Sequence, residues 1–90
     1  MAKTARRTGE RMLTPAQIRA ARALLDWSQP DLAKRCSVHV NTIKSFERGR
    51  SGPVWDTMAK IERALRKAGV EFIDGDEQRG PGVRLRDPQR

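Results

Sequence analysis

Residues 28–49, SQPDLAKRCSVHVNTIKSFERG, decide the fold. Ser28 and Asp31 have the spacing of a capping box, which opens a short helix that ends near Cys36. A tight break follows, and apolar periodicity resumes over roughly 39–48. The glycine that closes the stretch is a typical C′ residue of a helix. The stretch therefore predicts two short helices joined by a tight turn.

The second of these helices has two unlike sides. Ile43 and Phe46 have the spacing of an inward apolar face. The opposite side carries polar residues at i, i+3, i+4 and i+7, namely Asn41, Lys44, Ser45 and Arg48. Spacing alone favours an ordinary solvated face, since most surface helices show such a stripe. The interpretation of the stripe depends on what surrounds it.

Further elements flank the pair. Thr14 and Gln17 form another capping-box pattern, which predicts a helix ending near Trp27. A fourth helix over about 54–68 has an apolar stripe that consists of Trp55, Met58, Ile61, Leu65 and Ala68. The period then changes to alternation, which predicts two short strands with apolar positions at Val70, Phe72, Val83 and Leu85.

The chain of 90 residues has the length of one domain and is strongly basic. It carries 19 Lys and Arg against 11 Asp and Glu, a formal net charge of +8 with a sequence pI near 11.1. A small domain with so high a pI most often binds nucleic acid. No apolar run is long enough to span a membrane and no secretory signal is recognisable, so we expect a cytoplasmic, nucleoid-associated protein.

The residues offer little for catalysis. A lone cysteine, Cys36, excludes an internal disulfide and a cysteine-based zinc site, and His39 is the only histidine. No carboxylate pair, nucleophile–base pair or phosphate loop stands out. We expect no enzyme, cofactor, metal or small-molecule ligand, and we interpret Cys36 as a small buried or half-buried residue and not a redox sensor.

Charge divides the chain into three parts. Residues 1–13 have a net charge of +3 and no apolar periodicity, which indicates a flexible basic arm. Residues 14–69 carry +6 and hold the four predicted helices, while residues 70–90 carry −1. The expected fold is mainly α, a four-helix domain with a short C-terminal β-hairpin extension.

Two short helices joined by a tight turn form the layout of a helix-turn-helix, whose second helix enters the major groove of DNA. Residues 14–69 resemble the lambda-repressor-like (Cro/XRE) helix-turn-helix regulators of bacteria and phages. The resemblance is carried by Ile18 to Leu25, Trp27-Ser28-Gln29, Asp31-Leu32-Ala33, Val38, Thr42-Ile43, Phe46-Glu47-Arg48-Gly49, Met58, Ile61, Ala64 and Leu65. Together with the net charge, it favours DNA contact over a merely solvated stripe.

The resemblance also implies roles for single residues. The positions that face base edges are Val40, Asn41, Lys44 and Ser45. The residues expected at the DNA backbone are Gln29, His39, Thr42, Arg48 and Arg50. Arm residues expected to contact phosphate or a minor groove are Arg6, Arg7 and Arg11.

Several of these positions have a structural interpretation as well. Gln29 also matches a position that braces the recognition helix, and Arg22 and Glu47 match a pair that often joins the first and third helices by a salt bridge. Val40 is equally compatible with a thymine methyl contact and with filling a gap at the rim of the core. His39 is a phosphate neighbour or a weak helix cap.

Two positions depart from the family pattern. Ser37 stands where the turn usually has Gly, and a left-handed Ser costs about 1 kcal/mol relative to Gly. His39 stands where the recognition helix usually opens with Ser or Thr, and it is a poorer cap.

These features predict a sequence-specific, double-stranded-DNA-binding transcriptional regulator. We expect a repressor that binds a palindromic operator as a homodimer. The alternative is the antitoxin of a toxin–antitoxin pair that also binds its own promoter. The possible partner proteins are a toxin, for the antitoxin, and RNA polymerase, for a regulator. Non-specific packaging of nucleic acid would instead give equal affinity for all duplexes at matched salt.

A dimer is expected because one recognition helix covers too few base pairs to mark a site in a genome. The tail, residues 70–90, is the element that the helical core leaves free. Its apolar positions are therefore expected to build the dimer, namely Val70, Phe72, Val83 and Leu85. Truncation after Gly69 would then leave a folded monomer.

Overall fold

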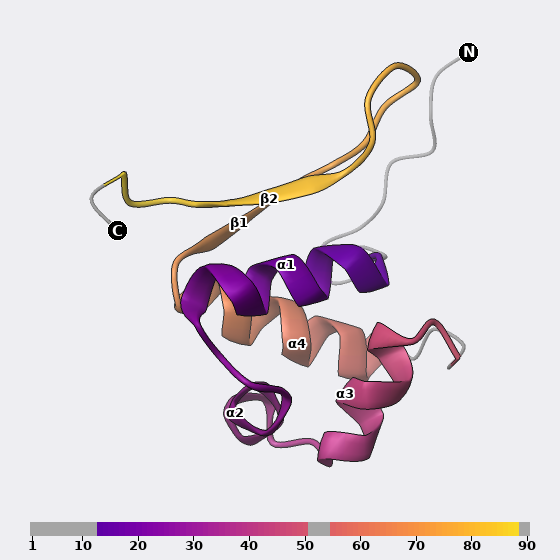
Figure 1. The fold of residues 1–90 in the computed structure, drawn as a ribbon, viewed down its shortest axis with the longest axis vertical. Coiled ribbons are helices and arrows are strands. Elements are labelled where there is room, and N and C mark those ends of the chain that lie inside the picture. The colour runs from indigo at the N-terminus through magenta and orange to yellow at the C-terminus, as the bar shows by residue number, and fades with distance from the viewer. Residues whose placement is uncertain (1–12, 51–54, 89–90) are drawn as a thin grey trace.

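The computed structural model describes residues 13–50 and 55–88. Within these residues the chain forms four α-helices and then an antiparallel β-hairpin (Figure 1). The elements are α1 (Pro15–Leu25), α2 (Gln29–Cys36), α3 (Val40–Glu47), α4 (Trp55–Lys67), β1 (Val70–Ile73) and β2 (Gly82–Leu85). The mainly α fold with a C-terminal hairpin, expected from the sequence, is confirmed.

Local chemistry sets the helix boundaries. Both capping boxes form: the hydroxyl of Thr14 accepts the backbone N–H of Gln17, and that of Ser28 accepts the backbone N–H of Asp31, each at 3.1 Å. α2 ends on Ser37, which has φ 59° and ψ 43°. Ser37 therefore keeps the left-handed conformation of the glycine it replaces, and the turn between α2 and α3 bears the associated strain.

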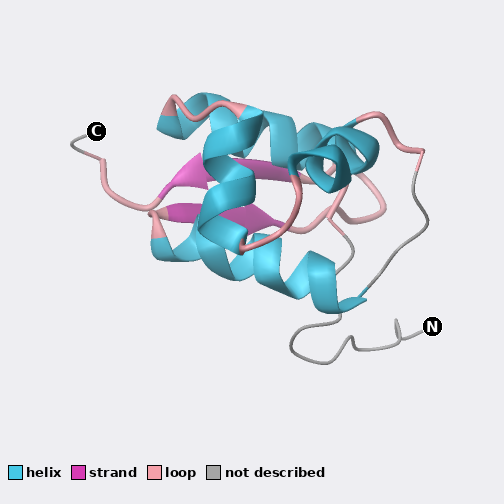
Figure 2. Cartoon of the chain, turned by 90° about the horizontal axis from the view of Figure 1, so that it is seen from below, coloured by secondary structure: helices cyan, strands magenta, loops and turns pink. Residues whose placement is uncertain are grey.

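The elements lie in layers. The hairpin covers one side of α1 and α4, and α2 and α3 lie on the other side (Figure 1). In the view from below, the two strands lie behind the helices (Figure 2). β2 packs against α1, while β1 packs against both α4 and α1. The α2–α3 pair and the hairpin are thus on opposite sides of the molecule.

Gln17 fastens the hairpin to the start of α1. Its Oε1 accepts the backbone N–H of Thr14 at 3.0 Å, which completes the capping box. Its Nε2 donates to the carbonyl oxygens of Gly82 at 3.0 Å and Ile73 at 3.4 Å, the last pair of the ladder. Because Gln17 is buried, this one side chain satisfies its own polar atoms while it joins the two elements.

The hydrophobic core extends beyond the helices. Val70 and Phe72 are buried in it, and Val83 and Leu85 pack against it. Leu13, which the sequence assigned to the arm, is buried as well. The core therefore crosses both segment boundaries inferred from charge. Truncation after Gly69 would remove Val70 and Phe72 from this core, so the folded monomer expected after that truncation stays an untested prediction.

One residue of the predicted apolar stripe lies at the surface. Trp55, placed in the apolar stripe of the fourth helix, is 43% exposed. It is the first residue of α4, one turn ahead of Met58, the first residue that the helix buries. The side chains that α4 does bury are Met58, Ile61 and Leu65.

Candidate nucleic-acid interface

The outward side of α3 carries the polar stripe that the sequence predicts. Asn41, Lys44 and Arg48 are exposed and Ser45 is half-buried. The opposite side is buried, with Ile43, Phe46 and Glu47 facing the core. The structure therefore brings the stripe together on one helix face, with two cations and one amide open to solvent.

His39 caps this helix. Its Nδ1 accepts the backbone N–H of Asn41 at 3.0 Å, and its carbonyl accepts the first helical hydrogen bond, from Thr42, also at 3.0 Å. The interpretation of His39 as a cap is confirmed, and the recognition helix begins at Val40. Because Nδ1 is the acceptor, a neutral imidazole carries its proton on Nε2, which leaves that N–H free to donate outward.

Val40 and Thr42 are less open than the stripe. Val40 is half-buried and packs against the edge of the core, and Thr42 is also half-buried. For Val40 this is the packing at the rim that the sequence left open as one of two interpretations. Its contact with a base, and that of Thr42 with the backbone, stay predictions.

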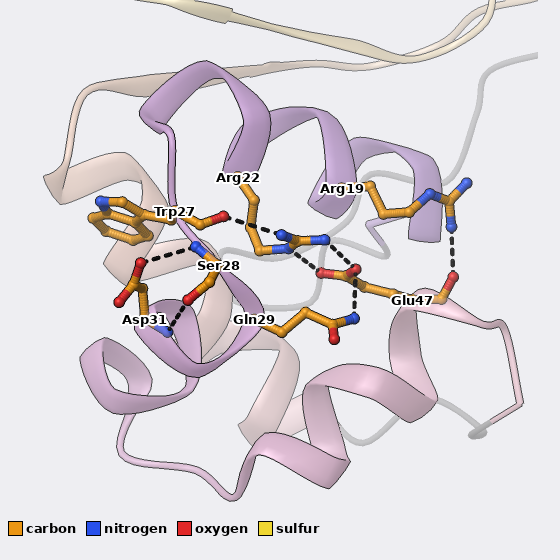
Figure 3. Close-up of polar contacts among 7 residues, drawn as sticks. All are labelled: Arg19, Arg22, Trp27, Ser28, Gln29, Asp31 and Glu47. Carbon is orange, nitrogen blue, oxygen red and sulfur yellow. Dashed lines mark hydrogen bonds and ion pairs between the residues drawn. The ribbon is translucent and has the colours of Figure 1, made fainter.

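Glu47, at the last residue of α3, is the centre of a buried polar network (Figure 3). Arg22 of α1 donates through Nε to Oε2 at 2.6 Å and through Nη2 to Oε1 at 2.7 Å. Gln29, the first residue of α2, donates to the same Oε1 at 3.0 Å. The predicted salt bridge between the first and third helices is confirmed, and Gln29 braces the recognition helix as expected.

The network is held in low-dielectric surroundings. The side chain of Glu47 is 3% exposed and that of Arg22 is 19% exposed. The hydrogen bonds to Glu47 raise the pKa of the Arg22 guanidinium, burial opposes this, and the opposite charge adds to it. A buried charge is stabilised only when its hydrogen bonds are satisfied, and here the bidentate geometry does so. The end of α3 is thereby fixed to α1.

Two members of the network were missed in the sequence. Arg19 donates through Nη1 to the main-chain carbonyl of Glu47, and the carbonyl of Trp27 accepts from Nη1 of Arg22 at 3.0 Å (Figure 3). Arg19 lies three residues before Arg22 and so on the same side of α1, which was a usable signal. Trp27 is half-buried against the core, and the Arg35 guanidinium lies 4.8 Å from the centre of its ring.

The residues expected to contact the DNA backbone differ in whether their side chains are already bound within the protein. Gln29 uses one N–H on Glu47, so a phosphate contact would rely on the rest of its amide. Arg48 and Arg50 are exposed and directly follow the last turn of α3. The arm residues lie outside the described residues, namely Arg6, Arg7 and Arg11.

The apolar residues assigned to dimerisation face their own chain. The register pairs Val70 with Leu85 and Phe72 with Val83, and all four lie on the side of the hairpin that packs on the helices. The sequence placed them in a contact between two copies because it left them without a partner. In the structure these side chains pack on the helices of their own chain, so they do not need a second copy to cover them. Their part in a dimer stays a prediction.

Comparison with known proteins agrees with this geometry. The model of the Cro/C1-type family, described as Helix-turn-helix, matches residues 18–72. No curated protein is similar enough in sequence to match. The chain belongs to this helix-turn-helix family, a DNA-binding regulatory family whose members are typically not enzymes, and it is a DNA-binding transcriptional regulator. Among the described helices, none is long and apolar enough to cross a membrane.

Proposed function

We propose that this protein is a sequence-specific repressor that binds a palindromic operator as a homodimer, with α3 in the major groove. The observation that supports this most is the two-sided character of α3. Its stripe of Asn41, Lys44 and Arg48 is open to solvent, whereas Glu47 on the other side is fixed to α1 and α2. A rigidly positioned polar helix face is what base recognition requires.

The chemistry of the stripe assigns the roles. The Asn41 amide offers a donor and an acceptor, which suits the N6 and N7 of adenine, and the Lys44 ammonium donates to guanine. Arg48 and Arg50 would neutralise phosphates beside the groove, since both are exposed at the end of the helix. Gln29 and the arm would add backbone contacts.

The alternative role as an antitoxin has less support. It would need the tail to cover a toxin, and the segment available for that was the C-terminal hairpin. Val70 and Phe72 of the hairpin are part of the chain's own core. We therefore favour the regulator that acts on DNA by itself.

Selection of bound sequences from random duplex DNA tests the proposal, and we expect a palindromic motif. Asn41→Ala and Lys44→Ala should each weaken operator binding by about 1–3 kcal/mol and binding to random duplex by less. Lys60→Ala is the matched control, because Lys60 is an exposed lysine on α4 and not on the stripe. Enrichment of no motif, or equal losses on both duplexes for the two stripe variants, would contradict the proposal.

A further inference from the structure

The solvent side of α1 is apolar, although 33% of the chain is charged. Its exposed residues are Ala16, Arg19, Ala20, Ala23 and Leu24. The one charged residue among them, Arg19, is turned to α3 by its hydrogen bond to Glu47. Leu24 is 39% exposed, one of the large apolar side chains that the described residues leave open. A helix face of small and apolar side chains is suited to close packing against another surface.

This face continues into a free strand edge. The backbone N–H of Arg86 donates to the carbonyl of Gly69 at 2.8 Å, which makes these two residues a hydrogen-bonded pair of the ladder. Hydrogen-bonded and non-hydrogen-bonded pairs alternate in an antiparallel ladder. The N–H and C=O groups of Val83 and Leu85 therefore point away from β1, and no hydrogen bond from another described residue reaches them.

The helix face and the strand edge lie next to each other. β2 packs on α1, while β1 packs on both α4 and α1, so the free edge of β2 is the one that faces away from β1. Ala20 and Leu24 follow Gln17 by three and seven residues, so they share the side of α1 that Gln17 turns to the hairpin. Since α1 buries its inner side against the core, these two exposed residues border the free edge of β2.

Charge distinguishes this surface from the others. A second copy of a chain with net charge +8 is repelled wherever cations gather. On α4, the exposed Lys60, Arg63 and Lys67 form one ridge at i, i+3 and i+7. On the outer side of the hairpin, the Arg84 guanidinium lies 2.8 Å from the Glu71 carboxylate, which compensates its charge. Among the described residues, the α1 and β2 side carries no such ridge, and Arg84, the cation of β2, is paired with Glu71 of its own chain.

We propose that a second copy of this chain binds at this surface. β2 pairs antiparallel with the β2 of the other copy about a two-fold axis at Arg84, and the apolar faces of the two α1 helices meet beneath the sheet. Each Val83 then exchanges two main-chain hydrogen bonds with the Leu85 of the other copy. This specifies the interface of the homodimer in the proposed function, on which it rests. The contact uses the main chain of β2 and the helix α1, instead of the hairpin's apolar side chains.

The symmetry of this dimer suits one DNA duplex. The two-fold axis of two antiparallel strands is perpendicular to their sheet. The hairpin and the α2–α3 pair lie on opposite sides of the helical layer (Figure 1). Rotation about that axis therefore brings both copies of α3 to the same side, away from the four-stranded sheet, as two half-sites on one duplex require.

Ala20 is the position at which to test the contact. α1 and β2 run in the same direction (Figure 1), and Gln17 lies under Gly82 at the start of β2. Two residues along a strand advance about 6.6 Å, which corresponds to roughly four residues of helix. The helix surface under Arg84 is thus near Ala20, so Ala20→Glu would place two carboxylates close to the axis. The side chain is exposed in one copy, so the fold is retained.

The experiment measures the dimer dissociation constant by sedimentation equilibrium. Ala20→Glu should raise it roughly tenfold or more, because like charges would face each other in the contact. Lys60→Gln lowers the net charge by the same one unit on α4 and should leave it unchanged. Exchange of the Val83 and Leu85 amides, followed by NMR, should slow as concentration rises through the dissociation constant. A monomer at every concentration, a dimer unaffected by Ala20→Glu, or free exchange of both amides in the dimer would each overturn the proposal.

The DNA-binding proposal is judged separately. If the interface is wrong but the function right, the protein selects a palindromic motif and Ala20→Glu binds it as well as the wild type does. If the function is wrong, no motif is selected, whatever the sedimentation result.

Discussion

Glu47→Gln tests whether the buried ion pair holds the recognition helix in place. The variant keeps the shape of the side chain but removes the charge opposite Arg22, and it turns one of the two acceptor oxygens into an amide. Breaking a buried ion pair by removing one partner costs about 3–5 kcal/mol. Because the Arg22 side chain is 19% exposed, water compensates part of the loss, and we expect about 2–3 kcal/mol. For a domain of this size that is a fall in Tm of roughly 10–20 °C.

Thermal and urea unfolding, followed by circular dichroism, measure this loss. A second variant with Arg22→Met and Glu47→Leu together separates the charge from the packing. Replacing both partners by apolar residues of similar volume is often close to neutral, so the double variant should be more stable than Glu47→Gln. A loss below about 0.5 kcal/mol in Glu47→Gln would show that the pair contributes no more than an exposed one. The pair would then not be what holds α3 in position.

Three other residues can each be tested by a single substitution. Gln17→Glu keeps the capping acceptor but cannot donate to the hairpin carbonyls, so urea unfolding should show a free energy of unfolding lower by about 1–3 kcal/mol. An unchanged urea midpoint would mean that this side chain does not hold the hairpin. Ser37→Gly relieves a left-handed serine and should raise stability by up to about 1 kcal/mol, whereas a loss would contradict the strain at that turn. Burial raises the pKa of the Cys36 thiol from 9.0 to about 11. The neutral thiol is favoured in the folded state, so stability is unaffected below pH 9 and falls as pH rises toward 11, and Cys36→Ala should abolish this decline. Iodoacetamide should also label the folded protein at pH 8 about 100-fold more slowly than it labels a free thiol. Labelling at the rate of a free thiol would place Cys36 at the surface.

The helices could be read from the sequence because their signals are local. The caps at Thr14 and Ser28 act within three residues, and the structure forms both. The pairing of Arg22 with Glu47 is a long-range contact, yet it came with the family resemblance. One of the two interpretations of His39, a weak helix cap, is confirmed, because its imidazole offers an acceptor where Ser or Thr usually offers a hydroxyl.

The place of the hairpin in the fold was harder to predict, because alternation identifies a strand but not what covers its apolar side. Val70 and Phe72 looked free of the helical core, and a second copy was the partner that the sequence suggested. In the structure the core is incomplete without them. The hydrogen bond that fastens the hairpin to α1 joins Gln17 to Gly82, 65 positions apart in sequence. From the sequence alone, Gln17 already had a complete local role in its capping box. No local pattern reveals such a second role.

α1 is central to the proposed activity because both α3 and the hairpin are fastened to it. Glu47 ties the end of α3 to α1 through Arg22, and Gln17 ties the hairpin to the opposite side of the same helix. The recognition stripe and the free edge of β2 are therefore both positioned by one rigid element. In a two-fold dimer built on that edge, the separation of the two recognition helices depends on few flexible joints, and half-site spacing is then set by the fold itself. An exposed, uncharged α1 face has a function in such an assembly that it lacks in an isolated chain.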